Sequence, residues 1–108
     1  MSSTPEQTGS RARMRFLVER YGPGLSLDRL RAAEAALHRA SAASTREGRP
    51  VRYLGSTYIA AEETVFATFE ADDQTSVAEV NRRAGQRFDR IVAVVDLGGR
   101  QSESNGEE

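Results

Sequence analysis

The stretch VRYLGSTYIAAEETVFATFEA (residues 51–71) determines the predicted topology, because two strand patterns follow each other directly in it. Residues 51–59 and 64–71 are both rich in β-branched and aromatic side chains, which favour strands. Only AAEE (residues 60–63) separates them, a length typical of a short turn. The middle of the chain is therefore predicted to be an antiparallel β-hairpin.

One strand and one helix are predicted before this hairpin. RFLVER (residues 15–20) has an apolar centre and is short, which favours a strand, and YGPG (residues 21–24) ends it. Ser26 is a favourable N-cap, and apolar residues recur at helical spacing after it. We therefore predict a helix over residues 27–43, which STREGRP (residues 44–50) ends.

A second helix and a last strand are predicted after the hairpin. Ser76 and Glu79 fit a capping box, so the helix is expected over residues 77–84. Gly85 suits the C-cap position of that helix. Residues 88–97 (FDRIVAVVDL) are almost wholly apolar after their first positions and predict the final strand.

The predicted order is strand, helix, strand, strand, helix, strand, which is the ferredoxin-like βαββαβ arrangement of the α+β class. Right-handed crossovers place both helices on one face of a four-stranded antiparallel sheet. The more apolar alternating sets are expected on the helix side: Phe16, Val18, Val65, Ala67 and Phe69. The opposite face then carries Leu17, Glu19, Phe66, Thr68 and Glu70.

That opposite face mixes apolar and acidic side chains, whereas a face in contact with water usually reads as polar. A large apolar surface on a soluble domain usually meets a partner, and a second copy in a two-fold dimer is the economical one. We therefore expect a homodimer whose two sheets enclose a barrel-like space, a dimeric α/β barrel. The alternative is a monomer with one partly hydrated sheet face.

Composition excludes several classes of function. The 108 residues suffice for one domain, predicted over residues 13–97, with disordered tails at 1–12 and, acidic in character, at 98–108. There is no cysteine, which excludes disulfides, thiolate metal sites and a cysteine nucleophile. Net charge is −1 and the basic residues form no block, so no nucleic-acid partner is expected. Without an apolar run of membrane-spanning length, we expect a soluble cytoplasmic protein with no membrane partner.

Three segments carry a family resemblance: FLVERYGPGLSLDRL (residues 16–30), VRYLGSTYI (residues 51–59) and VFATFEADDQTSVAEVNRRAGQRFDRIVAV (residues 65–94). The shared motifs are the VER strand end and, beyond it, Tyr53, Ser56, Glu70-Ala71, Ala84-Gly85 and Asp89. The chain resembles a family of small bacterial domains of unknown function that includes an actinobacterial nickel-binding protein. The resemblance implies a ferredoxin-like fold that pairs into dimeric α/β barrels.

Three positions depart from that family. Ala67 stands where members often carry a cysteine, and Asn81 where they often carry a histidine. Glu19 stands where the nickel-binding member has a histidine. Metal binding in the family would rest on such side chains, so the resemblance implies weak or absent nickel binding here. We expect no resident cofactor and no metal ligands.

Glu19 is the candidate catalytic residue, as a carboxylate at a strand end that can act as a general base or a ligand. The alternative is a solvated or arginine-paired carboxylate, with Arg20 facing the other way. Six residues are candidates for ligand binding: Tyr21, Tyr53, Ser56, Phe66, Glu70 and Asn81. His38, the single histidine, is expected on a solvated helix face.

Two functions are argued from the residues, and a third, a structural or interaction module whose tails engage partners, has only the lack of a clear active site in its favour. The first is a homodimeric barrel protein that binds a small molecule. The second is a small cofactor-free enzyme of isomerase, cyclase or monooxygenase type that uses Glu19 as its base, an inference by analogy of fold. The sequence does not choose a ligand or a substrate for either.

Overall fold

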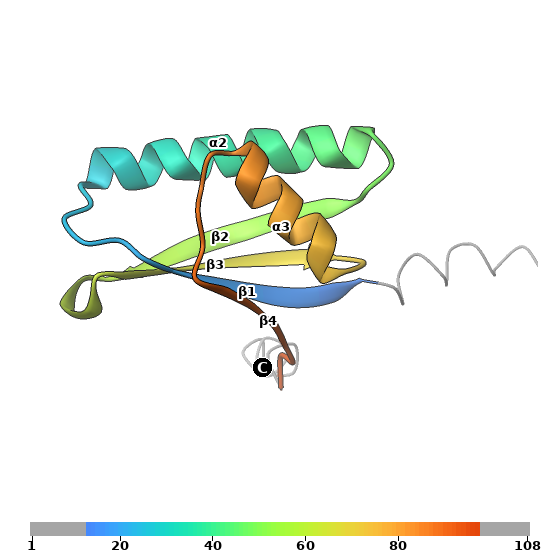
Figure 1. Cartoon of the computed structure of the whole chain (residues 1–108). Helices are drawn as coiled ribbons and strands as arrows, with labels where there is room; N and C mark the ends of the chain where they lie inside the picture. Colours follow the sequence, from blue (N-terminus) through green and yellow to red (C-terminus); the bar gives the residue numbers. More distant parts are fainter. Residues whose placement is uncertain (1–12, 98–108) are drawn as a thin grey trace, which may run out of the picture.

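The structure is a computed structural model that describes residues 13–97. Its elements follow the predicted order (Figure 1): β1 (Met14–Tyr21), α2 (Leu27–Arg46), β2 (Val51–Ile59), the 3₁₀ helix η1 (Ala60–Glu62), β3 (Thr64–Ala71), α3 (Gln74–Arg83) and β4 (Arg90–Val94). The two tails predicted to be disordered, residues 1–12 and 98–108, lie outside the described residues.

The four strands form one sheet in the order β2-β3-β1-β4, and every neighbouring pair is antiparallel. Both helices lie on the same face of this sheet (Figure 1): α2 packs on β2, and α3 packs against α2, β3 and β4. The predicted ferredoxin-like α+β fold is confirmed. Neither helix in residues 13–97 is long and apolar enough to span a bilayer.

The core lies between the helices and the sheet, as the alternation in β1 and β3 predicts. Phe16, Val18 and Phe69 point to the helix side and are buried, whereas Leu17 and Phe66 between them are only half-buried. The helices complete the core with small and branched side chains: Leu37, Ala40, Val77 and Val80. The predicted division of the two sheet faces therefore holds at these positions.

Helix α2 is capped by Ser26 as predicted, but it runs to Arg46 rather than ending at residue 43. The extra turn is stabilised by hydrogen bonds between the Thr45 side chain and the backbone that follows the helix. The Thr45 hydroxyl accepts a hydrogen bond from the Val51 amide and donates one to the Val51 carbonyl, each at 3.1 Å. A polar stretch predicted to end the helix instead fastens it to β2.

Helix α3 starts earlier than predicted, and the predicted capping box is wrong. Asp73 is the N-cap, and its carboxylate accepts a hydrogen bond from the Ser76 amide at 2.9 Å. Glu79 instead pairs with Arg82 at 2.7 Å. The aspartate outcompetes the serine because its carboxylate is charged and sits at the positive end of the helix dipole. Gly85, with φ 73°, follows the last helical turn and tolerates the left-handed backbone there.

Strand β4 is shorter than the predicted strand over residues 88–97. Its start is set by Asp89, whose carboxylate accepts the Tyr21 amide at 2.7 Å and whose own amide donates to the Glu19 carbonyl at 2.8 Å. Val94 pairs with Arg15, and β1 begins only one residue before Arg15, at Met14. The chain after Val94 therefore runs past the start of its partner strand, and the pairing ends there.

Candidate functional site

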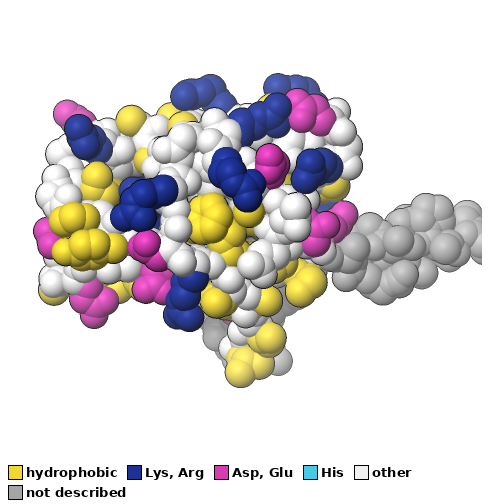
Figure 2. Space-filling view, viewed as in Figure 1, with side chains coloured by type: hydrophobic (Ala, Val, Ile, Leu, Met, Phe, Trp, Pro, Cys, Tyr) yellow, Lys and Arg dark blue, Asp and Glu magenta, His cyan; other side chains and the backbone are white. Residues whose placement is uncertain are grey.

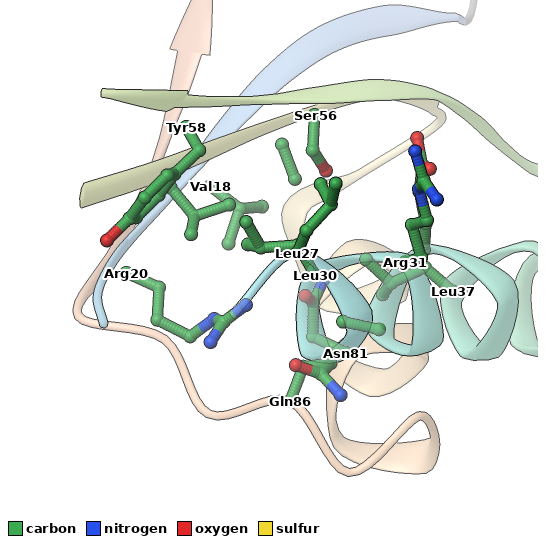
Figure 3. A pocket seen from close by; sticks show the side chains of 14 residues that line it. Val18, Arg20, Leu27, Leu30, Arg31, Leu37, Ser56, Tyr58, Asn81 and Gln86 are labelled. Carbon is green, nitrogen blue, oxygen red and sulfur yellow. The ribbon is translucent and has the colours of Figure 1, made fainter. Parts of the chain in front are cut away.

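A cavity of about 230 Å³ lies between the first half of α2 and the helix side of the sheet. Its wall is largely apolar and is formed by Val18, Leu27, Leu30, Leu37, Val65 and Ala67. Polar groups reach it from several elements: Arg20, Arg31, Glu34, Ser56, Asn81 and Gln86. Figure 3 shows these side chains converging from β1, β2, α2 and the α3 end on one space. An apolar wall with a few convergent polar groups is the usual composition of a small-molecule site.

Leu54 makes a bulge in β2 that brings Ser56 and Tyr58 into this cavity. Tyr53 pairs with Phe69, and the next paired residue is Gly55, so Leu54 is an extra residue without a partner. Strict alternation from Tyr53 would have turned Gly55 to the helix side, but the bulge turns Ser56 there instead. Gly55 has φ 130°, a backbone conformation that only glycine adopts readily. Gly55 therefore permits the bulge that places Ser56 and Tyr58 at the cavity.

Arg20 is the charged group at one end of the cavity. It shares the helix side of β1 with Val18 and is half-buried. Burial lowers the pKa of its guanidinium, the nearby Arg87 lowers it further, and Asp89 and Tyr53 act in the opposite direction. None of the ion pairs found within residues 13–97 includes Arg20. The cavity therefore contains a partly desolvated cation.

Tyr53 and Ser56 form a hydroxyl pair beside the cavity. The two hydroxyl groups are hydrogen-bonded to each other, and burial raises the pKa of the Tyr53 phenol. The His38 ring meets the Tyr53 ring edge-on, with 4.7 Å between the centroids. His38 is exposed as expected, but it is not free of the core, because it covers one side of a buried aromatic ring.

Asn81 and Gln86 line the end of the cavity formed by α3. The Asn81 amide group donates to the Val77 carbonyl at 2.9 Å, and its backbone carbonyl accepts the Gln86 amide at 2.9 Å. Asn81 is 2% exposed, so its side-chain amide is buried, and the hydrogen bond to Val77 already uses one of its N–H groups. Tyr58 reaches across the sheet, and its hydroxyl donates to the Gly22 carbonyl at 3.4 Å.

The open face of the sheet carries ion pairs around an apolar centre. Glu19 pairs with Arg90 at 2.7 Å. Glu70 lies between two arginines, Arg15 at 3.2 Å and Arg52 at 3.3 Å. Uncharged, half-buried residues lie between these two sets of ion pairs. Three are apolar, Leu17, Phe66 and Val92, and the fourth is Thr68. Glu19 is thus arginine-paired, which is the alternative that the sequence left open.

The structure divides the predicted site residues between the two faces. Tyr53, Ser56 and Asn81 lie on the helix side, at or beside the cavity. Their predicted companions lie on the open face, by the strand register: Glu19, Tyr21, Phe66 and Glu70. Tyr21 is 51% exposed at the end of β1. The seven residues therefore do not form one site in one subunit.

Sequence reasoning missed the charged groups of the cavity, Arg20 above all. The signal was present, because Arg20 follows Val18 at strand spacing and must share its face. Figure 2 shows arginine and carboxylate side chains interspersed over the visible surface, with hydrophobic side chains between them. Because arginines are so frequent on this surface, residue type alone does not distinguish Arg20, and its strand spacing from Val18 is the one signal that places it on the helix side.

The fold and the cavity define this protein as a ferredoxin-like α+β domain with a pocket of small-molecule size between its helices and its sheet. The chain belongs to the SCO4226-like family: the family model described as "Nickel responsive protein SCO4226-like" matches residues 16–94. The resemblance stated from the sequence is thereby confirmed.

Among solved structures, the chain is similar to SCO4226 from Streptomyces coelicolor A3(2). The two share 26% sequence identity and a TM-score of 0.59, over 74% of this chain and 94% of that chain. No curated protein matches the chain significantly.

The side chains present do not fit a nickel centre within one subunit. Residues 13–97 contain no group of three or more histidine, cysteine, aspartate or glutamate residues that could hold a metal ion. Nickel sites in proteins favour imidazole and thiolate donors, but the chain has one histidine and no cysteine. Ala67 and Asn81, where the resemblance implies cysteine and histidine, both line the cavity, and Glu19 lies on the other face.

Proposed function

We propose that this protein binds a small organic molecule in the cavity between α2 and the sheet, and that it does so as a homodimer. The observation that supports the first part is the composition of the cavity wall, with apolar side chains on the floor and polar groups converging at its ends. Family membership supports a role in a nickel-related response, because the family model carries that description.

The apolar wall supplies the affinity in this proposal. Val18 comes from β1 on one side of the cavity, and Leu30 and Leu37 come from α2 on the other (Figure 3). Burial of apolar ligand surface against such a wall contributes roughly 25 cal/mol per Å². An apolar cavity of about 150 Å³ holds benzene, so 230 Å³ suits about nine non-hydrogen atoms.

The homodimer rests on the open face of the sheet. Leu17, Phe66 and Val92 form an apolar centre there, and the helices cover only the opposite face (Figure 1). Glu19 with Arg90, and Glu70 with its two arginines, border this centre. An apolar centre with a charged rim is the usual anatomy of an interface, and a two-fold axis would pair it with itself.

The experiment is an NMR titration of ¹⁵N-labelled protein with benzamide, a neutral probe of nine non-hydrogen atoms. We expect saturable amide shifts concentrated at Val18, Leu30 and Ala67. The variant Ala33→Leu fills the cavity and should abolish these shifts, whereas Ala35→Leu makes the same change at an exposed position of the same helix and should preserve them. Shifts that persist in Ala33→Leu, or that map to the open face, contradict the proposed site.

A further inference from the structure

We propose that the ligand of this cavity is a small apolar acid whose carboxylate pairs with the guanidinium of Arg20. The inference rests on the proposed function and specifies its ligand class. The position of Arg20 supports this inference. Arg20 is a half-buried cation that lines the cavity together with an apolar wall. It takes part in none of the ion pairs found within residues 13–97.

Asp89, the carboxylate that raises the pKa of Arg20, is already engaged by other partners. Asp89 accepts the Tyr21 amide at 2.7 Å and the Arg87 guanidinium at 3.1 Å, and these contacts lower its pKa. Arg87 also donates to the Tyr21 carbonyl at 2.9 Å. Asp89 is therefore held as part of the β1–β4 joint, and its charge is balanced by Arg87, with which it forms an ion pair.

The remaining charges of the cavity wall balance each other. Arg31 and Glu34 both reach it from α2 and carry opposite charges. The net charge left at the cavity is therefore that of Arg20. Partial desolvation of a cation costs free energy, which an anion in contact with it offsets. A guanidinium presents paired N–H groups that match both oxygens of a carboxylate.

Size and polarity restrict the acid. The wall beyond Arg20 is apolar and the volume suits about nine non-hydrogen atoms, which describes an aromatic or branched monocarboxylate. A phosphorylated ligand fits less well, because it would place up to two negative charges beside a single unbalanced arginine. Ser56 and Gln86 lie on the cavity wall. Each can donate a hydrogen bond to a substituent on the acid or accept one from it.

The test compares benzoate with benzamide, two planar probes of the same size that differ in charge, by NMR titration of the full chain. We expect benzoate to bind at least about tenfold more tightly than benzamide, since a charge-assisted bidentate pair is among the strongest hydrogen-bonded contacts. Arg20→Gln should remove the preference while benzamide still binds. Arg29→Gln, which removes an exposed arginine of α2 outside the cavity wall, should preserve it.

Each result has a definite meaning. Equal binding of the two probes overturns the assignment of an acid and leaves the cavity as a neutral-ligand site. A benzoate preference that survives Arg20→Gln overturns the role of Arg20. If neither probe binds, both this inference and the proposed function fail. Arg20→Lys adds a check against misfolding, because it keeps the charge and should retain part of the preference.

Discussion

The Glu19 carboxylate lies 2.7 Å from Nε of Arg90 across the β1–β4 pair, at the edge of the open sheet face. The pair joins the end of one strand to the start of the next, and its partners are 32% and 64% exposed. The Glu19 carboxylate is thus engaged by a partner within its own subunit. It is separated by the sheet from the cavity that contains Arg20.

Replacement of Glu19 by glutamine should therefore leave the cavity unaffected. We expect the free energy of unfolding to change by less than about 1 kcal/mol, because exposed ion pairs contribute little. Benzamide binding should match that of the unchanged chain. Urea denaturation and the NMR titration measure the two quantities. Loss of a turnover in this variant with intact folding would instead support the cofactor-free enzyme that uses Glu19 as base.

Replacement of Asp73 by alanine removes the N-cap of α3. We expect a loss of about 1 kcal/mol of unfolding free energy, the usual cost of such a substitution. Asp72→Ala is the matched control, since it removes the same charge one residue earlier without touching the cap. Equal stability of the two variants in urea denaturation would show that the cap contributes nothing.

The Asp73 cap also predicts a dependence on pH. The Ser76 amide lowers the pKa of the Asp73 carboxyl below its ordinary value of 3.8. The unfolded chain therefore binds a proton at higher pH than the folded one. The contribution of the cap is present above the ordinary value and is lost as pH falls through the folded pKa. The stability gap between the unchanged chain and Asp73→Ala should narrow below about pH 4; a constant gap would contradict this linkage.

Replacement of Phe66 by glutamate tests the homodimer. Phe66 lies at the half-buried centre of the open face, so a charge there should dissociate two subunits paired through it. Ala35→Glu adds the same charge to the exposed surface of α2 and should leave the dimer intact. Analytical ultracentrifugation distinguishes the two states. A monomer in the unchanged chain would exclude this interface.

Nickel binding by the isolated chain should be weak. The donors that nickel favours are reduced to His38, which lies exposed on α2 with its ring against Tyr53. We expect calorimetric titration of tag-free protein with Ni²⁺ to show no stoichiometric binding in the micromolar range. The variant His38→Gln should behave like the unchanged chain. Tight binding at one ion per subunit or per dimer would require donors that a single subunit does not bring together.

The fold could be predicted because several local signals agree. The hairpin over residues 51–71, the helical spacing after Ser26 and the apolar last strand each specify one element, and together they admit one familiar topology. The errors lie at element ends. At α3, two acceptors competed for the same helix start, and the charged Asp73 won over Ser76.

The site was harder to predict, because it depends on features that a pattern of residue types does not record. The bulge at Leu54 reverses which residues of β2 face the helices, so Ser56 and Tyr58 reach the cavity. Arg20 looks like a surface arginine until its neighbours are known. The sheet separates Glu19 from Asn81, although both were predicted to serve one site.

The decisive measurement is native mass spectrometry of the protein, purified without a metal column and mixed with benzoate or benzamide. We expect a dimer that takes up to one probe molecule per subunit, with the adduct lost in Ala33→Leu and kept in Ala35→Leu. A chain that shows no adduct with either probe, or an equal adduct in both variants, would contradict binding in the cavity between α2 and the sheet.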